Sequence, residues 1–175
     1  MAPLFNGEDI CLNLFDLINK HMKPDERQLP QMVLTSQFVV LSTIDPHGYP
    51  HTRAMLNLRN EKLYPHLQAL YRADGNPMAI YLTTNTSSDK TAEILSCPKA
   101  SLYYFDGAHY KGICLRGKVE VVPDAEFKKQ AWGPGWEEYY PDGVGSEDFA
   151  MLRFVPESIE SYGSLSVEKV DLSRI

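Results

Sequence analysis

The sequence predicts an α+β chain that is mainly β, and three observations lead to this interpretation. Several short segments alternate apolar and polar residues, as strands with one buried face do. Turn sequences such as Asp45-Pro46-His47-Gly48 and Asp106-Gly107 separate consecutive segments and predict antiparallel hairpins. Patterns with helical spacing are few and mostly short. A closed or nearly closed barrel would protect the edges of so few strands.

The individual elements follow from these patterns and from the turn residues between them. Helices are expected from Asn6 to about Met22, from 88 to 96 and from 123 to 130. The stretch 59–76 is polar and reads as a long loop with room for one helical turn at 66–71. The last dozen residues are a short strand or a tail. The expected strands are residues 37–44, 49–58, 78–84, 99–105, 110–122, 149–155 and 158–162.

A chain of 175 residues with 43% hydrophobic and 23% charged residues has room for one domain with one core. We expect a single domain over 1–175, in which 1–30 form an N-terminal helix and connector and 31–165 form the barrel. The densest apolar run, residues 38–41, is far shorter than the roughly 18 residues that span a bilayer. The first residues lack the pattern of a secretory signal, so we expect a cytoplasmic protein.

The charge balance narrows the classes of partner. Seventeen Lys and Arg against 23 Asp and Glu give a net charge of −6, which argues against nucleic acid and against an anionic membrane surface. A small anionic ligand remains compatible, because one or two local cations suffice to bind it. Cys11, Cys97 and Cys114 are scattered, and His47 and His51 flank a turn without an acidic third ligand, so no metal site is expected.

The segment 80–90 is the most informative candidate for a binding site. It reads as a strand, a hydroxyl-rich turn and the start of a helix, where unpaired amide groups and the helix dipole favour an anion. Thr84 and Ser88 add hydroxyl donors, and Lys90 adds a cation in the first turn. The segment therefore reads either as a phosphate-binding cradle or as an ordinary helix N-cap with a solvated lysine. Asp89 favours the second reading, because a carboxylate beside a phosphate is unfavourable.

Arg53 is the second candidate. The alternation of residues 49–58 places it on the strand face opposite Ala54 and Leu56. Taken alone, such an arginine is usually solvated or ion-paired. If the third strand lies beside it, its guanidinium group could bind the same phosphate that Lys90 reaches.

These residues belong to a longer set of sequence pieces whose order and spacing carry a resemblance over residues 38–162. The chain resembles the pyridoxamine 5′-phosphate oxidase-like group of FMN-binding split barrels, nearest its general stress protein 26 branch. The pieces are Leu41-Ser42-Thr43-Ile44-Asp45 with Gly48-Tyr49-Pro50-His51, Thr52-Arg53-Ala54-Met55, Tyr81-Leu82-Thr83-Thr84 to Ser88-Asp89-Lys90, Ile94-Leu95 with Cys97-Pro98-Lys99-Ala100-Ser101-Leu102, Leu115-Arg116-Gly117-Lys118-Val119-Glu120, and Leu152-Arg153-Phe154-Val155-Pro156-Glu157-Ser158-Ile159-Glu160.

The resemblance implies a six-stranded antiparallel split β-barrel of Greek-key type with a few short flanking helices. It implies a homodimer with FMN near the subunit interface and a small-molecule oxidoreductase that takes electrons from a reduced nicotinamide. The family's cofactor-binding residues fall on Arg53 and Lys90, with Ser88, at the phosphate, on Ala54 and Met55 along the flavin, and on Thr83 and Thr84 near ribityl or phosphate oxygens. No catalytic residue follows from it.

The chain departs from the family pattern at four positions. Asp89 replaces a cation, Leu58 stands where a second cation ends the Arg53 strand, Gly112 falls near an expected glutamine, and Tyr162 replaces a tryptophan. These departures keep a second hypothesis open, in which the protein is non-catalytic or stress-related. Such a protein would bind FMN weakly or not at all, or would bind another flat ligand such as haem or a deazaflavin.

Two aromatic groups have competing interpretations. Trp132 and Trp136 suit packing against the end of the barrel better than stacking on a flavin or a partner subunit. For Tyr103, Tyr104 and Phe105, core or dimer packing is preferred over stacking on nucleic-acid bases, because the net charge is negative.

Overall fold

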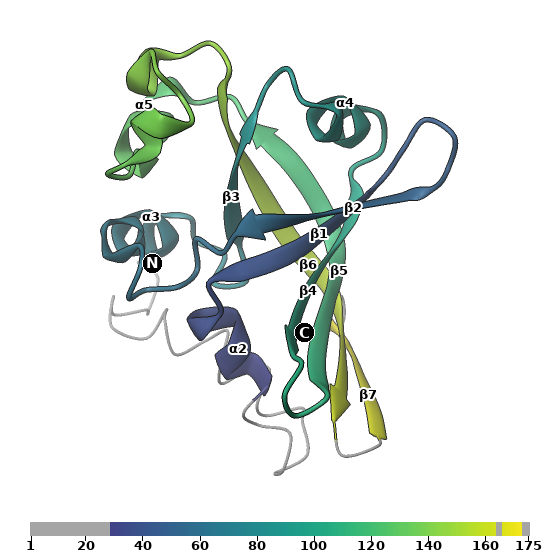
Figure 1. Cartoon of the computed structure of the whole chain (residues 1–175). Helices are drawn as coiled ribbons and strands as arrows, with labels where there is room; N and C mark the ends of the chain where they lie inside the picture. The colour runs from purple at the N-terminus through teal and green to yellow at the C-terminus, as the bar shows by residue number, and fades with distance from the viewer. Residues whose placement is uncertain (1–28, 164–165, 173–175) are drawn as a thin grey trace, which may run out of the picture.

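The structure, a computed structural model, describes residues 29–163 and 166–172 (Figure 1). Its centre is one antiparallel sheet in which the strands follow the order β2-β1-β4-β5-β6-β3, and β7 pairs with β6 outside this path. The mainly β architecture predicted from sequence is confirmed, with β7 as a strand beyond the six that the resemblance implied. The strands are β1 (Phe38–Ile44), β2 (Pro50–Leu56), β3 (Ile80–Asn85), β4 (Lys99–Asp106), β5 (Lys111–Val122), β6 (Phe149–Gly163) and β7 (Ser166–Asp171).

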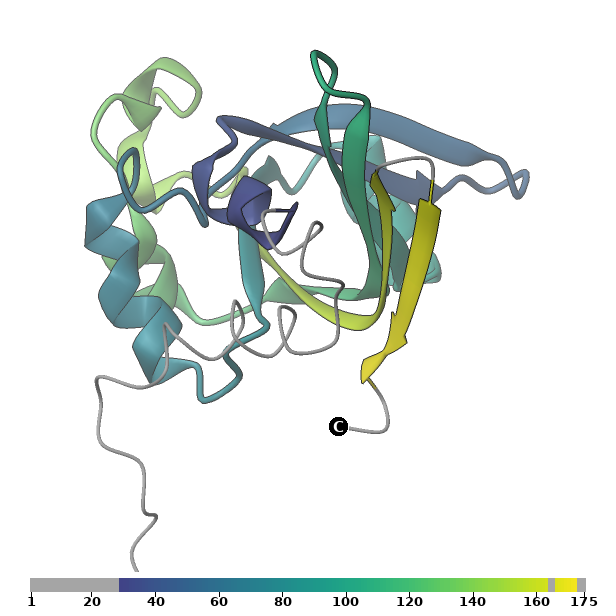
Figure 2. The same ribbon diagram turned by 90° about the horizontal axis from the view of Figure 1, so that it is seen from below.

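The longest strand, β6, changes partner along its length and thereby curls the sheet. Its first part lies between β5 and β3, and its last part lies between β5 and β7. The sheet does not close, because β2 and β3, at the two ends of the path, approach each other without pairing. Figure 2 shows the strands curving around α2. The result is a barrel that is split between β2 and β3.

The sequence predicted a break at Pro156 and two separate strands there, and this prediction was wrong. β6 runs through Pro156, which faces Gly117 next to an irregularity in the pairing between Arg116 and Gly117. A proline is tolerated in a strand at a bulge, since it cannot donate to the regular ladder. Gly117 is required there, because a Cβ at this position would overlap the Val155 carbonyl oxygen and lie 2.7 Å from Pro156 Cα.

Alternation along the strands sorts residues into the barrel interior and the outer surface. The interior is a continuous apolar cluster that includes Leu41, Leu102, Leu115, Leu152 and Phe154, all of them fully buried. Burial of this one face from every strand fixes the register of the sheet.

Short helices cover the ends and one side of the sheet (Figure 1). Residues 1–28, which include the predicted helix from Asn6 to Met22, lie outside the described residues. The predicted long loop at 59–76 contains a short helix, and a further helix, not expected from sequence, begins at Leu29. The helical segments are α2 (Leu29–Thr35), η1 (Pro65–Leu67), α3 (Gln68–Ala73), α4 (Asp89–Ser96), α5 (Ala125–Ala131), η2 (Trp136–Glu138) and η3 (Gly143–Gly145).

A second apolar cluster lies on the outer side of β3 and β6, beneath α3 and α5. Trp136 is buried in it, and Trp132 packs edge-on against Phe149 at 5.1 Å between ring centroids. Both tryptophans therefore pack against other side chains of this apolar cluster, which is the interpretation that the sequence analysis preferred. In the described part of the chain, no helix is long and apolar enough to cross a membrane.

The close approach at Gly117 generates the first prediction. Gly117→Ala should lower the free energy of unfolding by about 2 kcal/mol or more, because the added methyl group overlaps the β6 backbone, which cannot swing aside. Urea unfolding followed by circular dichroism measures this. Gly145→Ala is the matched control, since a Cβ there has no atom within 4 Å and should leave stability almost unchanged. Equal stability of the two variants would contradict the proposed role of Gly117.

Candidate functional site

A pocket lies where the barrel is split, between β2 and β3. Its volume is about 340 Å³. One wall comes from the end of β2, the opposite wall from β3, and a third from the aromatic residues around η2. The lining residues are Arg53, Ala54, Met55, Leu56, Thr83, Thr84, Asn85, Lys90, Trp136, Tyr139 and Tyr140.

A second pocket, of about 420 Å³, shares Arg53 and Lys90 with the first. It is formed by His51 and Arg53 of β2 and by residues 87–90 at the start of α4. We call it the anion pocket and the first one the β2–β3 pocket. All seven residues proposed from the sequence line one or both of them: six the β2–β3 pocket, and Ser88 the anion pocket.

The turn before α4 is held by its own hydroxyl groups. Ser88 is the N-cap residue, but its side chain does not cap the helix. The hydroxyl donates instead to the Asn85 carbonyl oxygen at 2.7 Å and lies 3.2 Å from the hydroxyls of Thr84 and Thr91. The hydroxyl-rich sequence therefore fixes the shape of the turn.

Asp148, which the sequence analysis did not single out, lies directly before β6 and anchors the same turn from its neighbouring strand. Its carboxylate accepts hydrogen bonds from the Ser87 amide at 2.8 Å, the Asn85 side chain at 2.6 Å and the Thr86 hydroxyl at 3.0 Å. The hydrogen bond from the Ser87 backbone N–H has the largest effect and that from the Asn85 side chain the next largest. Together they hold the pKa of Asp148 well below its usual range. One backbone amide of the expected phosphate cradle is thus already bonded to a carboxylate.

Arg53 is held in place by Glu93 of α4, a second residue that the sequence analysis did not single out. Its guanidinium Nη2 donates to Glu93 at 2.9 Å, and Nη1 donates to the Thr43 hydroxyl. Only 4% of the Glu93 side chain and 17% of the Arg53 side chain are exposed. The guanidinium group is therefore fixed in place before any ligand binds.

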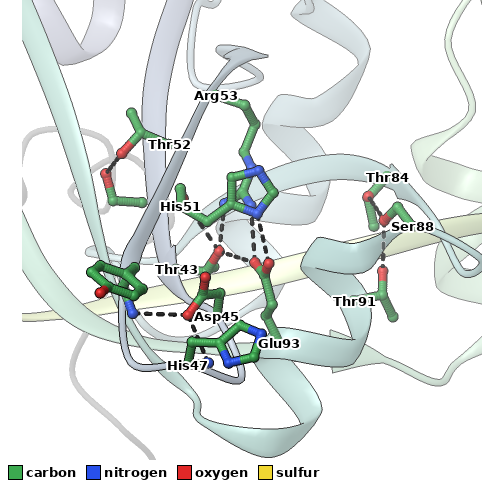
Figure 3. A network of polar contacts seen from close by, with 12 residues as sticks. Thr43, Asp45, His47, His51, Thr52, Arg53, Thr84, Ser88, Thr91 and Glu93 are labelled. Carbon is green, nitrogen blue, oxygen red and sulfur yellow. Dashed lines mark hydrogen bonds and ion pairs between the residues drawn. The ribbon is translucent and has the colours of Figure 1, made fainter.

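Glu93 also joins His51 to this network (Figure 3). The Nδ1 atom of His51 lies 2.6 Å from the other carboxylate oxygen. Burial alone would raise the pKa of Glu93, but hydrogen bonds from Thr43, His51 and Arg53 outweigh it and lower the pKa to about 2. Glu93 is thus an ionised carboxylate around which two basic side chains are arranged. The sequence analysis placed His51 beside a turn and did not connect it with Glu93.

Lys90 approaches the pockets from the opening turn of α4. Partial burial lowers its pKa, the positive charge of Arg53 lowers it further, and Asp89, Glu93 and Asp148 oppose the shift. None of the ion pairs within residues 29–163 and 166–172 includes Lys90. Two cations that repel each other therefore share the walls of both pockets, an arrangement that a bound anion would stabilise.

The four departures from the family pattern fall in different surroundings. Asp89 lines the anion pocket. Leu58 is completely buried in the second cluster, where a cation would be strongly unfavourable. Gly112 is covered by the Tyr103 ring and pairs with Tyr162 on the outer face of the sheet. Within the described residues, no group of three His, Cys, Asp or Glu side chains could hold a metal ion.

Sequence comparison points to one family. The family model described as pyridoxamine 5′-phosphate oxidase matches residues 26–163. The chain is 31% identical over 125 residues to the pyridoxine/pyridoxamine 5′-phosphate oxidase of Azorhizobium caulinodans, covering 71% of this chain and 50% of that protein. It is 34% identical over 99 residues to the enzyme of the same name from Rhizobium etli, covering 54% and 41%. The chain thus spans half or less of these curated relatives.

Structural comparison agrees. A protein from Clostridium acetobutylicum related to general stress protein 26 superposes with a TM-score of 0.65 at 23% identity, over 97% of this chain and 99% of its own. The general stress protein 26 of Bacillus anthracis gives a TM-score of 0.62 at 15% identity, over 86% and 100%. These two structures share the fold, and the match of the family model covers the whole of the split barrel from β1 to the end of β6. On this ground the chain belongs to the pyridoxamine 5′-phosphate oxidase family.

Proposed function

We propose that this protein binds FMN at the split of the barrel and acts as a flavin-dependent oxidoreductase on a small molecule. The observation that carries the proposal is the placement of Arg53 and Lys90 on the walls of two pockets that share them. The anion pocket is polar and is lined by Arg53 and Lys90, and the β2–β3 pocket has an aromatic wall. FMN has a phosphate at one end and a flat ring system at the other, so its two ends match the two pockets.

The anion pocket suits the phosphate. The Arg53 guanidinium group is fixed by Glu93 and Thr43, and its remaining N–H groups are available to a ligand. Lys90 adds a second charge, and the start of α4 adds the positive end of a helix dipole. Ser88 supports this pocket by fixing the turn that carries Lys90.

The β2–β3 pocket suits the ring system and the sugar chain. Trp136, Tyr139 and Tyr140 supply an aromatic wall, and Ala54 and Met55 present the end of β2. Because β2 is unpaired on this side, alternate backbone N–H and C=O groups along residues 53–56, which line the pocket, are free of sheet partners there. The hydroxyl groups of Thr83 and Thr84 lie on the opposite wall, in the place proposed for ribityl oxygens.

FMN would supply the electron-transfer chemistry, with a reduced nicotinamide as the proposed electron donor. The residues of the chain bind the cofactor, orient it and shield one of its faces from water. The substrate of the named relatives is not part of the proposal, because the chain spans at most half of their length and departs from the family pattern at Asp89, Leu58, Gly112 and Tyr162.

A second candidate function rests on Asp89 and Leu58. A carboxylate in the anion pocket and the lack of a further cation both weaken phosphate binding. The protein would then be non-catalytic, or would hold another flat ligand such as haem or a deazaflavin. One of the structures with this fold is a haem-binding protein of Mycobacterium smegmatis, with a TM-score of 0.54 at 11% identity.

The proposal includes a homodimer with the flavin near the subunit interface. Exposed apolar side chains gather on the outer face of the sheet, and by strand register they share that face: Phe38, Tyr103, Phe105, Tyr162 and Val167. Val40 connects this face to the β2–β3 pocket, because it pairs with Tyr103 on one side and Ala54 on the other. A second copy that covers the face would therefore reach the pocket.

The proposal also places the protein in the cytoplasm. Cys97 and Cys114 are free thiols, which suits a reducing compartment.

Removing the charge of Lys90 tests the cofactor assignment. Lys90→Met should weaken FMN binding by about tenfold or more and leave riboflavin binding unchanged, because riboflavin lacks the phosphate. Flavin fluorescence titrations measure both dissociation constants. Lys62→Met, which removes an exposed lysine outside both pockets, is the control. A protein that takes up no added FMN would defeat the assignment, and mass spectrometry of any bound small molecule released on denaturation would then show whether it is haem or a deazaflavin.

Replacing Phe105 tests the dimer. Phe105 is 59% exposed, so Phe105→Glu should leave the fold intact while placing a charge in the proposed interface. Light scattering should give twice the 19.8 kDa of one chain for the wild type and the mass of a single chain for the variant. Leu95→Glu, at an exposed position on α4, should leave the dimer unchanged. A wild-type mass of one chain would contradict the proposed dimer.

A further inference from the structure

The anion pocket contains a basic residue that the assignment above does not use, His51. It precedes Arg53 by two residues on β2, so both side chains leave the same face of the strand. About half of the His51 side chain is exposed, and the ring forms part of the pocket wall together with Arg53 and Lys90. Its position therefore suits contact with a bound anion.

Glu93 fixes His51 and Arg53 relative to each other. One carboxylate oxygen bonds His51 Nδ1 at 2.6 Å, and the other accepts from Arg53 Nη2 at 2.9 Å (Figure 3). In the part of the chain that the structure describes, the ring hydrogen bond of His51 runs through Nδ1. Its Nε2 atom lies on the other side of the ring and is left for a ligand.

The local charges show why a third basic group matters. The two positive charges of Arg53 and Lys90 are balanced by two carboxylates: Asp89, which lines the pocket, and Glu93, which is paired with Arg53. Without His51 the pocket has no surplus of positive charge for a phosphate dianion. His51 is the further basic side chain on the wall of this pocket.

Building on the proposed FMN site, we propose that His51 is a third basic residue of the phosphate site. Glu93 is the positioning residue that directs His51 and Arg53 toward the same anion. Nε2–H of His51 donates to a phosphate oxygen, while Nδ1 stays bonded to Glu93. The same contacts would arise from a purely structural ion-pair network between β2 and α4, but the two accounts differ in ligand specificity. If His51 only holds β2 and α4 together, its replacement affects the binding of FMN and of riboflavin alike. If His51 contacts the phosphate, its replacement affects FMN binding alone.

Dissociation constants of FMN and riboflavin for the wild type and His51→Gln separate these accounts. We expect His51→Gln to weaken FMN binding by about tenfold and to leave riboflavin binding unchanged. His47→Gln is the matched control, because His47 is an exposed histidine in the neighbouring turn and lines neither pocket. Equal losses for both flavins, or no loss for either, would overturn the role of His51.

Glu93→Gln tests the positioning role with almost no change in side-chain shape. If Glu93 only competed with phosphate for Arg53, removing its charge would tighten FMN binding. If Glu93 positions the two basic residues, FMN binding weakens, because the amide keeps one acceptor oxygen and turns a donor NH2 group toward either His51 or Arg53. We expect at least a fivefold loss for FMN with riboflavin unchanged. Tighter FMN binding by this variant would refute the positioning role.

Inorganic phosphate tests the anion site without any flavin. In NMR titrations of the wild-type chain, phosphate should shift the ring-proton resonances of His51 and leave those of His47 in place. A protein that takes up no flavin but shows this shift would lose the proposed function and keep the present inference. Absence of the shift would overturn the inference, even if the protein binds FMN.

Discussion

The rest of the site depends on the hydrogen bonds and the ion pair made by one buried carboxylate, that of Glu93. It joins α4 to β1 and β2 through Thr43, His51 and Arg53, and so fixes the distance between the strand that carries Arg53 and the helix that carries Lys90. An ion pair this well buried is favourable only when further hydrogen bonds satisfy both partners, and Thr43 provides one to each. The network therefore holds Arg53 and His51 in place at the pocket wall without any ligand.

The strands were accessible from the sequence because they depend on local patterns, whereas those patterns left Arg53 and Lys90 open and the family resemblance singled them out. Alternation set the faces of β2 and β5, and the hydroxyl-rich turn before α4 pointed to residues 83–90. Glu93 and Asp148 were not accessible in this way. Glu93 lies 42 residues from His51, and Asp148 lies 61 residues from Ser87. In the sequence, each is an ordinary acidic residue of a helix or a loop, and only the packing of α4 and the pairing of β3 with β6 bring them to their partners.

The errors in strand assignment have a similar origin. Pro156 signals a break in any single-sequence reading, yet the bulge beside Gly117 lets β6 continue through it. Beyond Pro156, β6 pairs with β5 and β7, whereas its first part pairs with β5 and β3. β3 therefore lies at one end of the strand path and β2 at the other, and the β2–β3 pocket lies where these two strands approach each other without pairing.

The overall charge and the local charge of this protein lead to different conclusions about ligands. A net charge of −6 opposes binding of a long polyanion, which would have to lie against many acidic residues. A single phosphate samples only its immediate surroundings, because water and salt screen charges beyond about 10 Å. In the anion pocket these surroundings are Arg53, Lys90 and His51 against Asp89, with Glu93 already paired. An acidic protein can therefore select a small phosphate ester and still exclude nucleic acid.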